Sequence, residues 1–509
     1  MTQGSDNPLV AELESGAPFG VAADEVTRVD SHSAHVFLVG ERAFKVKRPV
    51  AFSFLDFTTE PQRRAALAAE LRLNRRFAPM LYVGLVKIVR VDGNLVVGGN
   101  GKALEWALEM VRFRADAQLD RIAAEGRLSA ELVRDLGRAV AALHRRAPLR
   151  PDKGGAEAMA EVVRGNREDL DNAPTGVFAP ADVDAVDRAA CDALDRFRRM
   201  LDRRRGTGHV RHCHGDLHLG NLAVFRGRVV PFDCIEFNED FACIDTVYDL
   251  AFLLMDLIDR DQPEAAQVVL QAWLTAEGDV EGLVLLPFFM AVRATIRAKV
   301  IAFAIADPSS EPEAVERARR YLTLAQDLLP PHAPILVAIG GWSGTGKSTL
   351  AQRLAPELLP VPGAIVLRSD VIRKHLEGVD SLTRLDPVAY DQDHNDHVYG
   401  ALRDAARRLL RAGCSVVADA VHARAEERAA IEAVATAEGA TFRGLWLEAP
   451  AECCCARVRA RRGDASDANE AVVTAQFRSD PGPVDWQHLS AAGDTDTVVA
   501  AAQVAIGKC

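Results

Sequence analysis

The eight residues that begin at Gly341 constrain the fold of this chain more than any other feature of its sequence. They read Gly-Trp-Ser-Gly-Thr-Gly-Lys-Ser and follow the apolar run Ile335 to Ile339, which is typical of a buried parallel strand. Residues 348–358 then favour a helix. In a strand–loop–helix unit of this kind, backbone N–H groups and the helix N-terminus surround phosphate oxygens. We therefore predict an α/β P-loop NTPase fold with a parallel sheet that binds ATP or GTP together with Mg²⁺.

The loop also supplies the side chains that a nucleotide and its metal require. Lys347 is predicted to neutralise phosphate charge and Ser348 to ligate Mg²⁺. The other nucleotide-binding residues predicted here are Gly341, Gly344, Thr345, Gly346 and Thr349. Residues 415–419 read as an apolar strand that ends in an acid, and we expect Asp419 to support the magnesium ion. The alternative for Asp419 is a helix-capping role at the strand end.

Between these two motifs, residues 364–367 predict a further strand, and Asp370 follows it closely. An acid at the carboxyl edge of a parallel sheet faces the crevice where ligands bind. Asp370 is predicted to accept a proton from a substrate hydroxyl, and Arg373 to hold the substrate; a plain N-cap is the alternative for Asp370. After a strand at 444–447, Arg457 and Arg461 are predicted to close as a lid on the phosphates. A solvated basic helix face is their alternative.

A second phosphotransfer motif precedes the first. Residues 214–221 read His-Gly-Asp-Leu-His-Leu-Gly-Asn, with the H-x-D-x-x-x-x-N spacing of a kinase catalytic loop. Transfer from ATP needs an acid to orient the attacking hydroxyl and oxygen ligands to hold magnesium. Asp216 fits the first role and Asn221 the second. Asp233, twelve residues beyond Asn221 at the end of another strand, is the second predicted magnesium ligand.

The residues before this loop predict a small β lobe. Runs at 35–39 and 43–47 alternate and are separated by a turn, and a helix is expected at 61–77. Lys45 on the second strand is predicted to contact the nucleotide phosphates, with Glu70 on the helix as its partner. Lys47 lies on the same strand face, so the choice between the two lysines stays open.

These elements resemble the aminoglycoside-phosphotransferase and choline-kinase superfamily over roughly residues 25–330. The resemblance implies a bilobal α+β protein-kinase-like fold, ATP, Mg²⁺ and transfer to a hydroxyl group. The loop at 30–35 contains no glycine, so it lacks the Gly-rich pattern of protein kinases. Because the superfamily often uses a short serine-bearing loop over the phosphates, the resemblance implies a phosphate contact for Ser33. It also implies that Asp249, in the run Asp-Thr-Val-Tyr-Asp-Leu-Ala, braces the catalytic loop.

Residues 334–470 resemble the small P-loop kinases of the zeta-toxin, gluconate-kinase and shikimate-kinase type. The matching runs are GWSGTGKST, RSDVIRK, VVADAVHARAEER and RVRARRGDASDA. The resemblance implies that Asp370 acts on the acceptor hydroxyl and that the acceptor is bound by Arg373, Arg424 and Arg428. Ser466-Asp467-Ala468 looks like the lid ending of kinases in this group.

Prolines at 330, 331 and 334 mark a linker, because proline ends helices and stiffens short connections. The predicted division is an N-terminal extension at 1–24, a kinase-like domain at 25–327, a linker at 328–334 and the P-loop domain at 335–509. The kinase-like domain is expected to comprise a β lobe at about 25–112 and a helical lobe at about 113–327.

Composition narrows the classes of function. The net charge of −11 argues against a surface that grips nucleic acid. The most apolar stretch, 283–306, contains three basic residues, which favours a buried helix over a membrane span. The polar N-terminus does not resemble a secretory signal, and the nine cysteines form no CxxC pair, so we expect a cytoplasmic protein.

The leading hypothesis is a bifunctional ATP-dependent kinase that phosphorylates hydroxyl groups of small molecules such as sugars, amino sugars or aminoglycoside-like acceptors. Two alternatives remain. One is a regulatory protein that senses nucleotide and has a single active kinase domain. The other is an enzyme of the zeta-toxin or polynucleotide-kinase kind.

Overall fold

The computed structural model describes residues 8–31, 33–52, 55–329 and 332–507. Its contacts divide the chain into two compact units. The first unit comprises Met1–Ser129, Ala142–Ala158 and Met200–Leu253. The second comprises Ala130–Ala141, Met159–Arg199 and Leu254–Cys509. The predicted linker includes residues 330–331 and the predicted extension includes residues 1–7, all of which lie outside the described residues.

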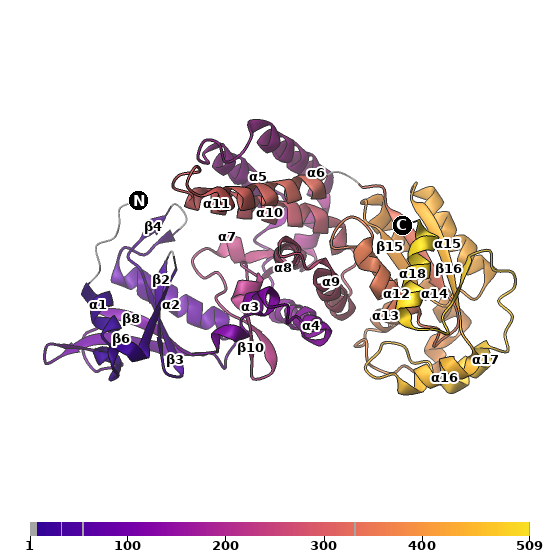
Figure 1. Ribbon diagram of the computed structural model, residues 1–509, viewed down its shortest axis with the longest axis horizontal. Helices are drawn as coiled ribbons and strands as arrows, with labels where there is room; N and C mark the ends of the chain where they lie inside the picture. Colours follow the sequence, from indigo (N-terminus) through magenta and orange to yellow (C-terminus); the bar gives the residue numbers. More distant parts are fainter. Residues whose placement is uncertain (1–7, 32, 53–54, 330–331, 508–509) are drawn as a thin grey trace. The chain divides into compact units, whose positions relative to one another are not determined.

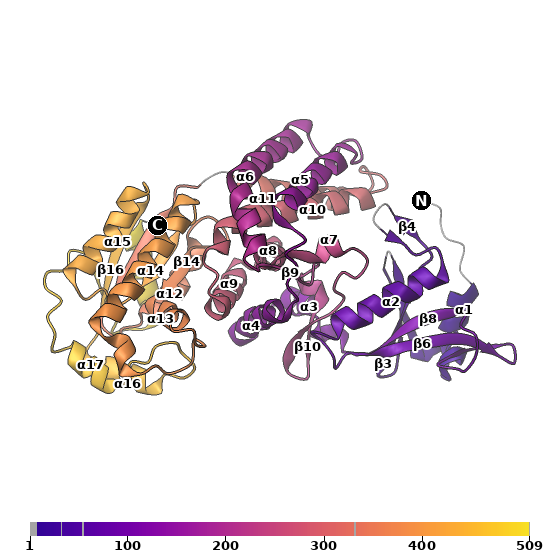
Figure 2. The same cartoon turned by 180° about the vertical axis from the view of Figure 1, so that it is seen from behind.

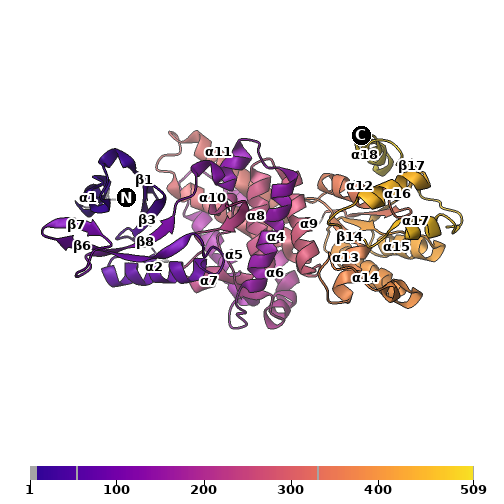
Figure 3. The same cartoon turned by 90° about the horizontal axis from the view of Figure 1, so that it is seen from below.

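A six-stranded antiparallel sheet forms the predicted β lobe. Its strands, in spatial order, are β1 (Val26–Asp30), β2 (Ala34–Val39), β3 (Arg42–Lys47), β8 (Glu105–Val111), β6 (Tyr82–Val91) and β7 (Asn94–Val97). The predicted hairpin is confirmed as β2 and β3. Helix α1 (Pro8–Glu14) covers one face of the sheet, and α2 (Glu60–Asn74) covers the other (Figure 3).

The catalytic-loop motif lies between two small two-stranded sheets. One sheet pairs β9 (Val210–His212) with β12 (Cys243–Asp245), and the other pairs β10 (Leu222–Phe225) with β11 (Arg228–Pro231). The loop runs from the end of β9 through a 3₁₀ turn at Leu219–Asn221 into β10. Helix α8 (Thr246–Asp259) follows β12 directly (Figure 2). The chain topology therefore brings residues 213–221 and the residues after β11 together.

Most of the remaining first half is helical, as predicted. The helices are α3 (Leu119–Ala124), α4 (Ala130–Arg146), α5 (Gly155–Asp171), α6 (Pro180–Gly206), α7 (Glu239–Ala242), α9 (Pro263–Glu277), α10 (Leu286–Ala304) and α11 (Pro312–Leu328). The short strands β4 (Ala51–Phe52) and β5 (Leu55–Asp56) pair antiparallel. The apolar stretch around α10 is confirmed as a largely buried helix that packs against α11 (Figure 1). Among the described residues, no helix combines the length and apolarity needed to cross a bilayer.

The second half contains the predicted parallel sheet. Its strands lie in the order β14 (Ile365–Arg368), β15 (Val416–Asp419), β13 (Ile335–Gly340), β16 (Thr441–Glu448) and β17 (Gln487–Ser490), and every pair is parallel. Helices α12 (Lys347–Leu354) and α18 (Thr495–Ile506) pack on one face, while α14 (Gln392–Arg411) and α15 (Ala425–Ala437) cover the other (Figures 1 and 2). The remaining helices are α13 (Ser369–Leu376), α16 (Ala451–Ala460) and α17 (Glu470–Gln476).

The helix after the phosphate-binding loop is shorter than predicted. It ends at Leu354, and a 3₁₀ turn at Ala355–Glu357 replaces its expected last part. Pro356 explains the difference, because a proline has no N–H to donate to the preceding turn and its ring clashes there.

Candidate active sites

The phosphate-binding loop has the backbone geometry that its glycines predict. Gly344 and Gly346 have φ angles of +87° and +100°, values that favour glycine over any residue with a Cβ. A Cβ on Gly344 would also lie 2.6 Å from the carbonyl oxygen of Cys454. The loop therefore keeps its path close to helix α16 only with glycine at this position.

Lys347 is a partly buried cation where the loop meets helix α12. Its Nζ donates hydrogen bonds to the carbonyl oxygens of Gly341 and Trp342 at 2.9 and 3.0 Å. Burial lowers the pKa of Lys347 below its usual value. Since neutral carbonyls hold the ammonium group, an anion at this position would supply its countercharge. These residues fit a nucleotide phosphate.

Oxygen ligands suitable for magnesium meet beside the loop. The Ser348 hydroxyl donates to Asp419 Oδ2 at 2.5 Å, and hard oxygen atoms are what Mg²⁺ prefers. Both residues line a cavity of about 1360 Å³, as do Thr345, Gly346 and Thr349. The donor set therefore fits a magnesium ion next to the phosphates.

Asp370 and Arg373, the predicted acceptor residues of the P-loop domain, border the same cavity. Asp370 is the second residue of helix α13, and burial raises the pKa of its carboxyl group. Arg373, one turn further on, is itself buried and donates to the Ala389 carbonyl at 2.6 Å and to Asn395 Oδ1 at 2.7 Å. Its guanidinium lies over the Tyr390 ring, so Arg373 forms a fixed part of the cavity wall.

The four other predicted arginines are placed differently. Arg424, Arg457 and Arg461 line the cavity. Arg457 donates to the Thr345 carbonyl at 3.3 Å and so contacts the phosphate-binding loop. Arg428 instead donates to four backbone carbonyls, those of His422, Ala423, Pro481 and Pro483, and is not among the residues that line the cavity. This geometry assigns Arg428 to holding loops together, and it does not place the residue against an acceptor.

The kinase-like motif of the first half has its own charged cluster. Lys45 Nζ lies 2.8 Å from Glu70 Oε1 and 2.5 Å from Asp233 Oδ1. Burial alone would lower the pKa of Lys45, but the charges of Asp233 and Glu70 outweigh it and raise the pKa. The structure thus joins a β-lobe strand, helix α2 and the residue after β11 through one lysine.

Lys47 is equally buried but has a different set of partners. Its Nζ lies 2.9 Å from Glu70 Oε2 and 2.5 Å from Glu236 Oε1. Burial raises the pKa of Glu236 despite the nearby ammonium group. Glu70 therefore bridges both lysines, and it is Lys45 that contacts the predicted magnesium ligand Asp233.

Replacing each lysine with methionine should separate these two roles. Lys47→Met leaves Glu236, with a side chain only 5 % exposed, as an uncompensated buried charge, and we expect a loss of roughly 3–5 kcal/mol in the free energy of unfolding. Lys45→Met leaves Glu70 paired with Lys47 and Asp233 in contact with solvent, so a smaller loss is expected. Urea denaturation of both variants measures this difference, and equal losses would contradict it.

The catalytic-loop residues are held by their neighbours. Asn221 Nδ2 donates to the Asp216 carbonyl at 3.0 Å and to its carboxylate Oδ2 at 2.9 Å. The buried His214 accepts from the Asp216 N–H at Nδ1, at 3.3 Å, and its Nε2 donates to the Phe232 carbonyl at 2.9 Å. Burial lowers the pKa of His214, which keeps the ring neutral in this role. Asp216 and Asn221 therefore present oxygen atoms from one fixed turn.

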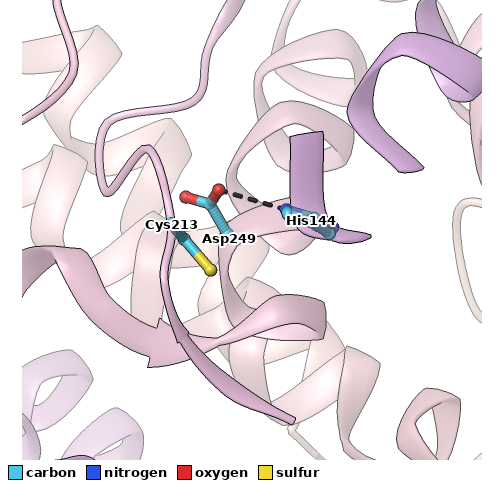
Figure 4. A group of neighbouring side chains, drawn as sticks. All are labelled: His144, Cys213 and Asp249. Atoms are coloured by element: carbon cyan, nitrogen blue, oxygen red, sulfur yellow. Dashed lines mark hydrogen bonds and ion pairs between the residues drawn. The ribbon is translucent and has the colours of Figure 1, made fainter. Parts of the chain in front are cut away.

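Asp249 braces this turn from helix α8. Its carboxylate accepts from the backbone N–H groups of His214 at 3.2 Å and Gly215 at 2.9 Å, and it contacts His144 Nε2 at 3.2 Å (Figure 4). Cys213 lies close by, so nitrogen, sulfur and oxygen atoms of these side chains come within 4.8 Å of one another. Burial raises the pKa of the Cys213 thiol, which disfavours the thiolate that a metal would need. We interpret the group as a loop brace.

Asp249→Ala should therefore destabilise the first unit. The substitution leaves two buried backbone N–H groups without their carboxylate, at an expected loss of roughly 3 kcal/mol in the free energy of unfolding. Asp249→Asn retains one side-chain oxygen and should lose less. Urea denaturation gives the free energy, and hydrogen exchange of residues 213–221 localises the change. An alanine variant as stable as the asparagine variant would rule out the brace.

The sequence analysis did not predict two contacts of Asp233 and Cys234. The Asp233 N–H donates to the Tyr82 hydroxyl at 3.0 Å, and the Cys234 N–H donates to Asn74 Oδ1 at 3.1 Å. Asn74 lies four residues after Glu70 on α2, so helical spacing places both on one face. No local signal in the sequence marks Tyr82 as a partner of Asp233.

Ser33 lies in the β1–β2 turn, where its carbonyl accepts from the Arg48 N–H at 2.8 Å. Its contact with a nucleotide phosphate stays a prediction.

These two sites define the class of the molecule: it is a phosphotransferase built from a bilobal kinase-like domain and a P-loop kinase-like domain. The chain belongs to the phosphotransferase enzyme family, whose model matches residues 25–283. A model described as an AAA domain matches residues 336–480. The resemblances predicted for the two halves are confirmed by these matches.

Similar proteins span both domains or one of them. Uncharacterized proteins of Mycobacterium tuberculosis and Mycobacterium bovis are each 28% identical over 453 residues, which is 88% of either chain. Among solved structures, an amicoumacin kinase is 14% identical, with a TM-score of 0.42, over 64% of this chain and 95% of its own. A gluconokinase from Sinorhizobium meliloti is 19% identical, with a TM-score of 0.25, over 34% of this chain and 95% of its own.

Proposed function

We propose that each domain transfers the γ-phosphoryl group of ATP to a hydroxyl group of a small molecule, at two separate sites that use ATP and Mg²⁺. The observation that carries the proposal is the meeting of Lys347, the Ser348–Asp419 pair and Asp370 around one cavity. A phosphate-binding cation, magnesium ligands and a candidate base are the parts that phosphoryl transfer requires.

In the P-loop domain, Lys347 would bind the phosphates, and Ser348 and Asp419 would hold the metal. When bound, Mg²⁺ neutralises charge that develops on the transferred group. Asp370 would accept the proton of the attacking hydroxyl, because its ionised carboxylate, with a pKa raised by burial, is a stronger base than an exposed one. Arg373 would form the acceptor wall.

In the kinase-like domain, Asp216 would orient the acceptor hydroxyl and take its proton. Asn221 and Asp233 would hold magnesium, and Lys45 would contact the phosphates. The ion pair between Lys45 and Asp233 supports this assignment, because kinases keep the phosphate-binding lysine close to a metal-binding aspartate.

The lining of the P-loop cavity favours a polar acceptor of small size. Arginines and acids line it, together with Asn395 and Tyr390. Such a wall suits a polyhydroxylated molecule such as a sugar or amino sugar. A nucleic-acid substrate is disfavoured by the net charge of −11.

The test is ADP release by the full-length chain with a panel of sugars, amino sugars and aminoglycosides, in the wild type and in the variants Asp216→Asn and Lys347→Ala. We expect stimulation by acceptors of each site, with every stimulated activity lost in one variant and kept in the other. If Asp216→Asn changes nothing while Lys347→Ala removes all turnover, the regulatory alternative with one active domain replaces this proposal. Salt-sensitive phosphorylation of oligonucleotides would instead favour the polynucleotide-kinase alternative.

A further inference from the structure

The segment Asp464 to Asp467, here called the latch, connects two walls of the P-loop cavity. It follows α16 and Arg461 and precedes α17. Both of its aspartates form ion pairs with residues of β14 or α13. The pairs are Asp464 with Arg368 and Asp467 with Lys374. The short run that ends the predicted lid is therefore joined to the acceptor side of the site by two ion pairs.

Asp467 accepts three hydrogen bonds from that side. Its Oδ2 lies 2.5 Å from Lys374 Nζ, 3.0 Å from the Leu385 N–H and 2.7 Å from the Tyr390 hydroxyl. Burial alone would raise the pKa of Asp467, but these donors outweigh it and lower the pKa. Lys374 is fully buried and also donates to the Thr383 carbonyl. One carboxylate thus anchors the loop at 380–390, which ends in the Tyr390 that packs on Arg373.

Asp464 connects the latch to the magnesium side. Its two carboxylate oxygens lie 3.0 and 3.1 Å from Arg368 Nη2. The Nε of the same arginine lies 3.4 Å from Asp419 Oδ2, the atom that accepts from Ser348. A line of charged contacts therefore leads from the latch to the predicted metal ligands.

The flanks of the latch reach the phosphate side. Arg461, three residues before Asp464, lines the cavity, and within the described residues its buried Nη1 has no hydrogen-bond partner. After the latch, Gln476 of α17 accepts from the Ser343 N–H of the phosphate-binding loop at 2.8 Å. Ion pairs buried in this way add little stability compared with apolar packing, so stability alone does not account for so many polar contacts here.

We propose that the latch is a positioning element that couples the two walls: it holds the acceptor wall, formed by α13 and the loop at 380–390, in place when the phosphate side is occupied. Asp467 and Asp464 act through Lys374, Tyr390 and Arg368, and they do not themselves touch the nucleotide. The inference rests on the proposed function of the P-loop site and adds the means by which nucleotide binding prepares the acceptor wall.

Hydrogen exchange of the full-length chain with and without Mg²⁺ and AMP-PNP tests this coupling. In the wild type, the nucleotide should protect residues 341–349, 455–463 and 380–391. In Asp467→Asn, residues 380–391 should exchange about tenfold faster or more and gain no protection from the nucleotide, while 341–349 remain protected. Tyr390→Phe removes one of the three donors to Asp467 and leaves the rest of the side chain in place. In this variant, the exchange rate of residues 380–391 should lie between those of the wild type and Asp467→Asn.

Asp480→Asn is the matched control, because Asp480 also lines the cavity and, within the part of the chain that the structure describes, accepts only a local bond from the Gly482 N–H at 2.8 Å. It should behave as the wild type does. Nucleotide protection of 380–391 that persists in Asp467→Asn, or that is missing in the wild type, overturns the coupling and leaves the proposed function standing. If AMP-PNP fails to protect 341–349 in the wild type, both the proposed function and the latch fail.

Discussion

Lys347→Ala should lower ADP release at the P-loop site by about 10²–10³-fold, since this lysine is the cation proposed to stabilise the developing negative charge. Its ammonium group is held by two loop carbonyls and lies near Asp419 and Asp370. Alanine removes the charge but no other hydrogen bond of the loop, so the fold should persist. The measurement is ADP release in a chain that also carries Asp216→Asn, where the kinase-like site contributes nothing.

Arg353→Ala is the control for this experiment. Arg353 lies on the same helix as Lys347, is half-exposed and pairs with Asp496 on α18. Truncating it removes a cation of the same helix without touching the cavity, so ADP release should stay within about twofold, as an exposed ion pair contributes little. If Lys347→Ala retains as much turnover as Arg353→Ala in this Asp216→Asn background, ADP release does not depend on Lys347 and the proposed role of this lysine is wrong.

Asp216→Asn should lower ADP release at the kinase-like site by about 10²–10⁴-fold, the range that a positioned general base contributes. Asparagine has nearly the same shape and keeps an oxygen for the Asn221 amide, which lies 2.9 Å from the carboxylate. It cannot take a proton from a hydroxyl group. The fall should therefore appear in kcat with little change in the KM for ATP, measured in a chain that also carries Lys347→Ala.

Asp240→Asn provides the comparison at this site. Asp240 follows the loop in sequence, but it is exposed and pairs with Lys153 at 2.7 Å. Its substitution should leave kcat unchanged. If Asp216→Asn instead raises the KM for ATP and spares kcat, the residue binds nucleotide and the proposed role of base is wrong.

Both chemical centres could be predicted from sequence because each is carried by a short run of backbone. The glycines, Lys347 and Ser348 lie within eight consecutive residues, and Asp216 and Asn221 lie five apart. A loop of this length adopts its conformation from local φ/ψ preferences and hydrogen bonds, so residue spacing alone fixes which atoms converge. Strands β13, β14 and β15 were predicted for the same reason, as short apolar runs between polar turns.

The partners of these centres could not be predicted in this way. Only the fold brings Lys45 to Asp233 and Lys47 to Glu236, across 188 and 189 residues of sequence. The two lysines share one face of a strand, so strand periodicity cannot tell which of them is the predicted phosphate contact. The packing of α2 and of the residues after β11 determines the partners of each lysine. For Arg428, the motif suggested a contact that the structure does not place against an acceptor. Its guanidinium instead donates to four backbone carbonyls of neighbouring loops.

The sequence by itself therefore determined where the two candidate sites lie: a predicted phosphate-binding loop at Gly341 to Ser348 and a predicted catalytic loop at His214 to Asn221, each on its own fold. Tertiary structure alone decided how the buried charges are shared: Glu70 bridges Lys45 and Lys47, Lys47 also meets Glu236, and the latch lies across the P-loop cavity. The physical reason is that backbone conformation is a local property, whereas pairing of buried charges depends on desolvation and on groups that only folding brings together.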